Sequence, residues 1–340
     1  MNAVLPRNSE RTLTVFCPLG LSNRLRVLLS GLVLAEATGR QFTMLWPSTP
    51  ACAAPFADLF ANNWPVQTVD ASAVAHLPYI SGWFGHLPEL LTLDEPHVTI
   101  GHPGWLIQPG QYLWHDQLMA RCQALFAELE PISPIRAAVE TFRQRHFRPT
   151  MIGVHLRRGD LLRQRPDAAS NTVQAVAAVD QFLAASPDTG IFLCTDDGAV
   201  APNRGRATRR EGVHETFRLR YGARVVWTTP RSLDRRDPQA IQDALIDLWL
   251  LRSTNIFVGT QASTFSETAV FGREIPYRLV AGATPGYQWL ERWARRLGVY
   301  AMLTRYSMKR NAGNAPFPAL LRHYAMAPYV WLRWIAGGRG

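Results

Sequence analysis

Short apolar runs and longer amphipathic stretches alternate along the chain, beginning near its start. The apolar run TLTVF (Thr12 to Phe16) is followed by a turn, by the amphipathic stretch RLRVLLSGLVLAEATG, which ends at Gly39, and by the run QFTMLWP. β-Branched apolar runs predict buried strands, and a glycine after an amphipathic stretch predicts the end of a helix. We therefore predict a strand–helix–strand unit, from which parallel α/β sheets are built.

A second series with the same order begins near Thr150. Strands are predicted for the runs TMIGVHL, GIFLCTDD, ARVVWTT, NIFVGT and PYRLV, and helices for TVQAVAAVDQFLAAS, DPQAIQDALIDLWLLRST and STFSETAVFG. Strict alternation of strands and helices indicates a parallel sheet covered on both faces. Between Cys52 and Pro134 the pattern is weaker, and we predict a short helix at FADLF among short strands and loops.

The two series predict two α/β halves, with a boundary near Ile132 to Pro149. We predict a Rossmann-like domain over 11–140, a second Rossmann-like domain over 150–285 and a helical tail over 286–340. The first residues lack the apolar segment of a secretory signal, and the longest apolar stretches are too short to span a bilayer. We therefore expect a cytoplasmic protein.

The tail and the overall charge leave further options open. Tryptophans and arginines near the C-terminus suggest peripheral contact with an anionic membrane, and the alternative is a helix packed back on the protein. A net charge of +10 suggests an anionic partner. However, Lys309 is the only lysine among 36 basic side chains, and these are spread along the chain, which argues against nucleic-acid binding. Four widely spaced cysteines fit neither a zinc site nor a disulfide framework.

The peptide IGVHLRRGD places an unusual set of polar side chains at the end of a predicted buried strand. His155, Arg157, Arg158 and Asp160 follow one another where the strand leaves the sheet. Ligands of such sheets bind outside the carboxyl ends of the strands, and a guanidinium can bind phosphate oxygens in a bidentate manner. The motif is therefore compatible with a diphosphate site, and equally with a surface turn at which Asp160 pairs with one arginine.

Two further stretches of the second half carry candidate chemistry. In GTQASTFSE, Thr264 and Glu267 have the spacing of a capping box, and the helix start offers N–H groups to an anion. The alternative is an ordinary capped helix with no ligand. Asp247 lies within an otherwise apolar helix, where a carboxylate needs a partner. A nucleobase such as guanine would supply one, and the alternative is a surface aspartate near Arg252.

Two polar turns complete the candidates. The adjacent carboxylates Asp196 and Asp197 end a predicted strand and would bind a metal, a ribose or a positively charged loop. In GLSNRLR, the side chains of Asn23 and Arg24 would reach a cleft from the first half, and the alternative is a helix N-cap at Ser22 or Asn23. This turn is no dinucleotide fingerprint.

In their order, these motifs resemble the superfamily of bacterial nodulation fucosyltransferases, core α1,6-fucosyltransferases and protein O-fucosyltransferases. The matching peptides are GVHLRRGD, TDD after a later strand, the helix that contains Asp247, and TFS at Thr264 to Ser266. The resemblance covers roughly Leu13 to Leu279. It implies a GT-B fold with two Rossmann-like domains facing a cleft, GDP-fucose as the donor substrate, inversion at the anomeric carbon, and neither metal nor cofactor.

The resemblance also implies roles for single residues. Arg157 would contact the β-phosphate with Arg158 beside it, and His155 and Asp247 would lie at the guanosine. The hydroxyl-rich turn would donate to the phosphates through Ser263, Thr264, Phe265 and Ser266. The core enzymes carry a lysine and a glutamate after the arginines, whereas this chain has LLRQRPDAAS without a glutamate. Asp160, or Asn23 acting by positioning, are the candidates for assisting the acceptor.

We therefore expect a metal-independent, inverting fucosyltransferase that acts on a saccharide acceptor. The negative charge that develops on the departing diphosphate would be stabilised by arginines in place of a metal ion. Two alternatives stay open: another sugar nucleotide as donor, or a non-catalytic protein that binds nucleotides or glycans on the same scaffold.

Overall fold

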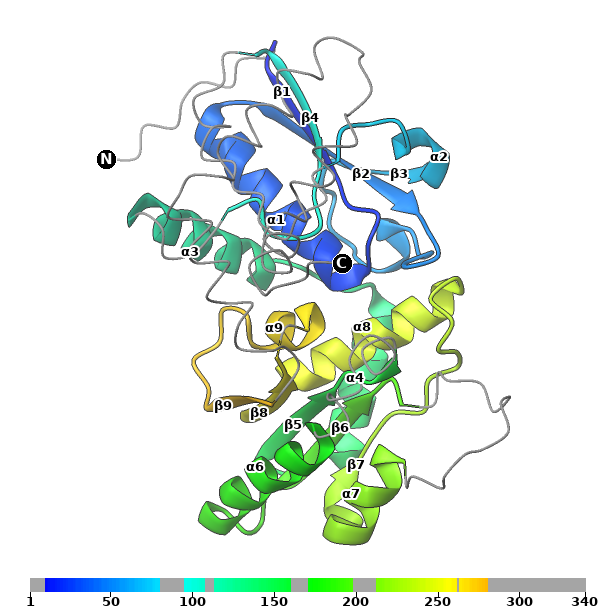
Figure 1. Ribbon diagram of the computed structural model, residues 1–340, viewed down its shortest axis with the longest axis vertical. Coiled ribbons are helices and arrows are strands. Elements are labelled where there is room, and N and C mark those ends of the chain that lie inside the picture. The colour runs from blue at the N-terminus through cyan, green and yellow to red at the C-terminus, as the bar shows by residue number, and fades with distance from the viewer. Residues whose placement is uncertain are drawn as a thin grey trace, which may run out of the picture. The chain divides into compact units, whose positions relative to one another are not determined.

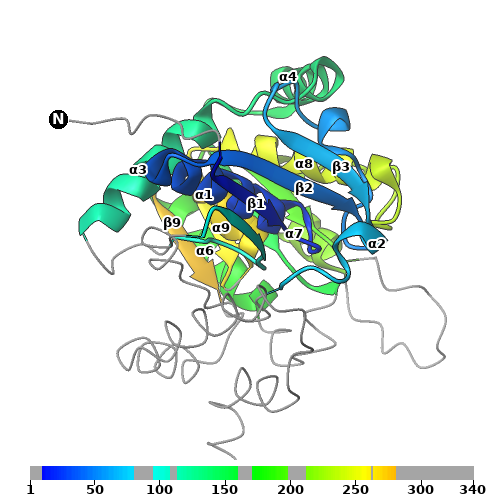
Figure 2. The ribbon, with the colours of Figure 1, turned by 90° about the horizontal axis from the view of Figure 1, so that it is seen from above.

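The structure of the chain is a computed structural model that describes residues 10–79, 95–107, 113–159, 171–197, 212–261 and 263–280. These residues form two units (Figures 1 and 2). The first unit contains the chain up to Thr49 and from Trp64 to Ala127, and the second contains Pro50–Asn63 and the described residues from Glu128 onward. The predicted contact of the C-terminal tail with a membrane lies outside the described residues.

The first unit is built on a four-stranded parallel sheet. Its strands, in the spatial order β3-β2-β1-β4, are β1 (Thr12–Phe16), β2 (Gln41–Ser48), β3 (Val66–Asp70) and β4 (His97–Gly101). Its helices are α1 (Leu21–Thr38), α2 (Ala71–Val74) and α3 (Leu113–Ala127). The apolar face of α1 covers the sheet, and Leu25, Leu28 and Leu29 are fully buried there.

Helix α1 ends as predicted but begins earlier. Gly39 adopts the left-handed conformation (φ 63°) and closes the helix, which confirms its predicted role as a C-terminal cap. The N-cap is Gly20, so the alternative of a cap at Ser22 or Asn23 is wrong. Both of those side chains are buried within the first turn, and Asn23 instead donates to the carbonyl oxygen of Pro103 at 2.6 Å.

The second unit has a five-stranded parallel sheet in the order β7-β6-β5-β8-β9 (Figure 1). Its strands are β5 (Met151–Leu156), β6 (Gly190–Thr195), β7 (Val225–Val226), β8 (Ile256–Thr260) and β9 (Tyr277–Val280). Its helices are α4 (Ser133–His146), α6 (Asn171–Ala185), α7 (Val213–Tyr221), α8 (Pro238–Arg252) and α9 (Thr264–Val270), with single 3-10 turns η1 (Phe56–Asp58) and η4 (Gly222–Arg224).

Helices cover both faces of this second sheet. Seen from above in Figure 2, α4 and α8 lie on one side and α6 and α7 on the other. The central strand β5 is buried along its whole length, as its continuous apolar run predicts for a strand covered on both faces. Phe217 of α7 and Val179 of α6 are fully buried in the same core as Ile152 and Val154.

Segment 50–63 is far from α8 in the sequence but packs against it. The ring centroids of Phe60 and Trp249 lie 5.9 Å apart, and Gln242 donates to the carbonyl oxygen of Asp58 at 3.1 Å. The short helix predicted at FADLF is confirmed as η1. No helix in the described part of the chain is long and apolar enough to cross a bilayer.

Candidate functional site

The predicted polar groups of the second unit gather where its central strands end. Because β5, β6 and β8 are parallel, their carboxyl ends meet at one edge of the sheet. His155 pairs in register with Cys194 on β6 and with Gly259 on β8. The loops that carry the arginines, the paired aspartates and the TFS turn therefore start at neighbouring positions, which is where sheets of this kind bind ligands.

His155 is held in a fixed orientation at this edge. Its Nδ1 lies 2.7 Å from the hydroxyl oxygen of Ser266, which also accepts a hydrogen bond from the Thr260 amide at 3.0 Å. The His155 ring lies against Phe265, with 4.8 Å between the ring centroids. Burial lowers the pKa of His155 to about 4, so the imidazole is neutral at physiological pH.

Thr260, at the end of β8, ties the end of β5 to the arginine loop. Its hydroxyl donates to the carbonyl oxygen of His155 at 3.2 Å and accepts from the amide of Arg157 at 3.0 Å. On the other side, the side-chain amide of Asn171 donates through Nδ2 to the carbonyl oxygen of Arg157 at 3.3 Å. The backbone of Arg157 is thus fixed from two neighbouring elements, which limits where its side chain can begin.

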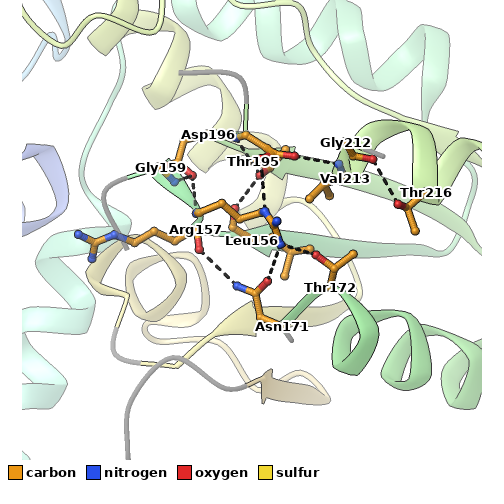
Figure 3. A network of polar contacts seen from close by, with 12 residues as sticks. Leu156, Arg157, Gly159, Asn171, Thr172, Thr195, Asp196, Gly212, Val213 and Thr216 are labelled. Atoms are coloured by element: carbon orange, nitrogen blue, oxygen red, sulfur yellow. Dashed lines mark hydrogen bonds and ion pairs between the residues drawn. The ribbon is translucent and has the colours of Figure 1, made fainter. Parts of the chain in front are cut away.

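The side chain of Arg158 makes its hydrogen bonds within the second unit. Its Nη1 donates to the hydroxyl of Thr172 at 2.6 Å and to the Oδ1 of Asn171 at 3.3 Å, and its Nε donates to Asp197 at 3.3 Å (Figure 3). Its side chain is only 11% exposed. In Figure 3 the side chain of Arg157 points away from this network. The two adjacent arginines therefore differ in position: Arg158 anchors the loop, and Arg157 extends from it.

The paired aspartates bind a positively charged loop, which is one of the three options the sequence leaves open for them. Asp196 accepts hydrogen bonds from the amides of Arg158 at 2.6 Å and Gly159 at 3.0 Å. Asp197 pairs with Arg158 and accepts from the amide of Val213, the first residue of α7, at 2.9 Å. Among the residues that the structure describes, no three His, Cys, Asp or Glu side chains form a cluster suited to a metal ion.

Asp247 faces the end of β6 and makes no ion pair with Arg252, so that alternative is wrong. Its carboxylate accepts from the hydroxyl of Thr228 at 2.5 Å and from the thiol of Cys194 at 3.6 Å. Arg252 instead donates to backbone carbonyls at the end of α9. Burial raises the pKa of Asp247 to about 6, since a carboxylate in a poorly solvated site is costly to ionise.

The TFS turn forms a capped helix start one residue earlier than predicted. Ser263 is the N-cap of α9, and its hydroxyl accepts from the amide of Ser266, so the predicted capping box between Thr264 and Glu267 is wrong. The extended backbone of Ser263 (φ −98°, ψ 113°) places its side chain over the first turn. The hydroxyls of Ser263 and Ser266 are both buried and used within the unit.

Two predicted site residues are not among the described residues of this group. Asp160 lies outside the described residues. Asn23 belongs to the first unit, where its side chain is 6% exposed, and the neighbouring Arg24 is fully buried against Trp46 and donates to the carbonyl oxygen of Leu19 at 2.8 Å. Both side chains are buried, so a role for Asn23 would be to position the backbone around Pro103.

Sequence reasoning missed several residues that hold the site together. Thr260, Thr228 and the pair Asn171 and Thr172 all supply hydroxyl or amide contacts to the predicted groups. One signal was present for Thr260, because a threonine that ends an apolar strand run lies at the ligand-binding edge of the sheet. Thr228 and Thr172 carry no comparable signal, because their roles depend on the spatial order of β7, β6 and β5.

Comparison with known proteins supports the motif-based resemblance. A segment of 123 residues, 36% of this chain, is 37% identical to GDP-fucose protein O-fucosyltransferase 2 of Drosophila melanogaster. The matched segment spans 23% of that relative's length, so it represents about a quarter of that protein. No protein-family profile matches the chain.

Solved structures share the fold over most of the chain. The crystal structure of NodZ α-1,6-fucosyltransferase soaked with GDP-fucose aligns with a TM-score of 0.54 at 20% identity, over 77% of this chain and 93% of that chain. The fucosyltransferase NodZ from Bradyrhizobium aligns with a TM-score of 0.51 at 18% identity, over 77% and 92% of the two chains. The predicted α/β fold of the GT-B class is thus confirmed, and the chain resembles the fucosyltransferase superfamily in its fold and in part of its sequence.

Proposed function

We propose that the chain is an inverting, metal-independent glycosyltransferase that transfers fucose from GDP-fucose to a saccharide acceptor. The observation that carries this proposal is the array at the ends of β5 and β8, where Thr260 joins the neutral His155 to the backbone of Arg157. The relative from Drosophila melanogaster is named for GDP-fucose, and a solved structure with the same fold was soaked with it, which supports this donor.

In this proposal, the second unit binds the sugar nucleotide. Arg157 contacts the β-phosphate, and Arg158 positions the loop through its contacts with Asp197 and Thr172. His155 and Asp247 lie on the guanosine side. The first turn of α9 contributes main-chain N–H groups, since the start of a helix is a common binding site for phosphate. The first unit, which makes up most of the predicted domain over 11–140, holds the acceptor.

The chemistry follows from charge. Breaking the bond between fucose and the diphosphate builds positive charge on the sugar ring and negative charge on the departing GDP. A guanidinium held in place before the reaction stabilises that negative charge without reorganisation. Because Thr260 and Asn171 fix the backbone of Arg157 from both sides, the arginine is placed before the donor arrives. This arrangement takes the part that a divalent cation has in metal-dependent transferases.

Consumption of sugar nucleotides tests the proposal. We expect the protein to consume GDP-fucose with a member of a saccharide panel, detected by mass spectrometry, and to retain its rate in EDTA. Consumption of GDP-mannose or a UDP-sugar in place of GDP-fucose would show that the donor is another sugar nucleotide. Binding of GDP with no turnover of any donor would favour the non-catalytic alternative, and a requirement for added manganese would contradict metal independence.

The raised pKa of Asp247 predicts how GDP affinity depends on pH. Guanine donates N–H groups, so it binds the ionised carboxylate. With a pKa of about 6 in the free protein, the carboxyl takes up a proton as the pH falls through that value. The ionised fraction drops about tenfold between about pH 7 and about pH 5, so the Kd of GDP should rise about tenfold. His155, with a pKa of about 4, stays neutral over this range.

Isothermal titration calorimetry at several pH values measures this effect, with Asp247→Asn as the matched variant. The amide does not titrate, so the variant should bind GDP more weakly and should keep only the pH dependence of the terminal phosphate of GDP, whose second pKa is about 6. If the GDP affinity of the unchanged protein stays constant from about pH 7 to about pH 5, Asp247 does not bind the guanine.

A further inference from the structure

A second loop rich in arginine leaves the same edge of the sheet. The stretch between β7 and α8 contains Arg231, Arg235 and Arg236 and leads from the carboxyl end of β7 to the N-cap of α8. Thr228, at the start of this loop, already contacts Asp247 of the candidate site. The loop therefore belongs to the set of strand-to-helix connections from which ligand sites in parallel sheets are built.

Two of these three arginines are neutralised by aspartates. Arg231 binds both carboxylate oxygens of Asp243, with 2.7 Å from Nη2 to Oδ1. Arg236 pairs with Asp234 at 2.8 Å. Arg235 is exposed, and within the described ranges of the chain its guanidinium has no carboxylate within ion-pair distance. Its positive charge is thus available to a ligand.

The backbone around Arg235 is fixed, although its side chain is exposed. Its carbonyl oxygen accepts from the amide of Ala53 at 3.1 Å. The amide of Asp237 donates to the carbonyl oxygen of Asp234 at 2.8 Å, and the Asp237 carboxylate caps α8 through the amide of Gln239 at 2.9 Å. The side chain of Arg235 therefore begins at a fixed backbone position, as a binding residue requires.

Arg235 lies close enough to the candidate site for its charge to act on His155. Both Arg157 and Arg235 act on the buried His155, where their positive charges add to the effect of burial in lowering its pKa. Charges shift a pKa in this way only when they lie near the group. The two cations therefore lie on the same side of the unit as the end of β5, although they come from different loops.

The diphosphate carries more negative charge than one arginine balances. The departing diphosphate of the proposed reaction carries more than one negative charge, whereas the guanidinium of Arg158 is compensated by Asp197. Arg157 by itself would leave part of that charge unmatched. An arginine that is not neutralised by the protein suits this position, because its planar fork binds phosphate oxygens in a bidentate manner.

We infer that Arg235 is a second phosphate-binding residue of this site, which works with Arg157 to hold the diphosphate of the nucleotide. The inference rests on the proposed function for the identity of the nucleotide. Its chemistry, however, requires only a diphosphate anion, and inorganic pyrophosphate therefore tests it separately from the donor.

Isothermal titration calorimetry with GDP, pyrophosphate and guanosine tests the inference on the full chain. Arg235→Ala should weaken GDP and pyrophosphate by about 10-fold or more, as expected for loss of a charge-assisted hydrogen bond. Guanosine, which has no phosphate, should bind as before. Arg235→Lys should restore part of the affinity, and Arg236→Ala, the matched control from the same turn, should change none of the three.

The outcomes separate this inference from the proposed function. Equal binding of pyrophosphate and GDP by the Arg235→Ala variant and the unchanged protein would overturn the inference, even if the enzyme uses GDP-fucose. An equal loss for guanosine would overturn it too, because it would indicate a structural effect. If the unchanged protein binds pyrophosphate but not GDP, and Arg235→Ala weakens that binding, the inference holds while the proposed donor fails. Binding of neither ligand would overturn both.

Discussion

Replacement of Arg157 by alanine is expected to lower the rate of fucosyl transfer by about 10²–10³-fold, the usual cost of removing one preorganised donor to a developing anion. The backbone of Arg157 would keep its contacts with Thr260 and Asn171, so the fold should persist. The loss should appear in kcat/KM and in the affinity for GDP, because the same guanidinium contacts the phosphate before and during the reaction.

Matched variants make this test specific. Arg157→Lys keeps the charge but loses the bidentate fork, so its rate should lie between those of the alanine variant and the unchanged protein. Arg236→Ala removes an exposed arginine that is paired with Asp234 and should leave transfer unchanged. Initial rates with GDP-fucose and circular dichroism of each variant give the comparison. Normal transfer by Arg157→Ala would refute the proposed role of this residue.

The sheet of the second unit was largely predictable from sequence because its central strands are compact apolar runs. Burial on both faces requires such runs, and the run that contains Ile152 and Val154 is completely buried. The ends of these strands were equally clear, since polar motifs follow them directly. Parallel strands place their ends at one edge, so the sequence alone is enough to expect His155 and the TFS turn at the same edge of the sheet.

Elements without such runs were not predictable in the same way. The stretch from Ile132 to Pro149 reads as a boundary because it is polar and contains prolines, but it forms α4, whose apolar side chains Ile135 and Val139 are buried. Segment 50–63 joins the second unit through contacts with α8 that are remote in sequence. Strand β3 is short and its mixed polarity gives no period of two, and β4 alternates over only four residues.

The different positions of Arg157 and Arg158 could not be read from their adjacency. Both are arginines at the end of a buried strand, and the sequence alone allows either to bind a ligand. The difference arises because Asp197 and Thr172, from two other loops, surround only the second side chain. Such contacts depend on strand order, in which β6 lies beside β5, and strand order is a property of the whole sheet.

Replacement of Asp196 by alanine is expected to reduce transfer by about 100-fold, although this residue need not touch the substrate. Its carboxylate accepts from the amides of Arg158 and Gly159 and so fixes the loop that begins at Arg157. Hydrogen bonds to a charged group contribute roughly 1.5–3 kcal/mol each. Partial relaxation of the loop reduces the total, so we expect unfolding free energy to fall by about 2–4 kcal/mol.

Asp196→Asn distinguishes geometry from charge. The asparagine Oδ1 can accept the same two hydrogen bonds, so this variant should keep transfer within about tenfold of the unchanged protein. The loop backbone at Gly159 approaches the Asp196 carboxylate closely, since a Cβ at Gly159 would lie 2.8 Å from Asp196 Oδ2. Chemical denaturation and initial rates measure both effects. Only the asparagine variant keeps the two hydrogen bonds to the loop amides. If the asparagine and alanine variants lose activity equally, the charge of Asp196 matters more than these hydrogen bonds.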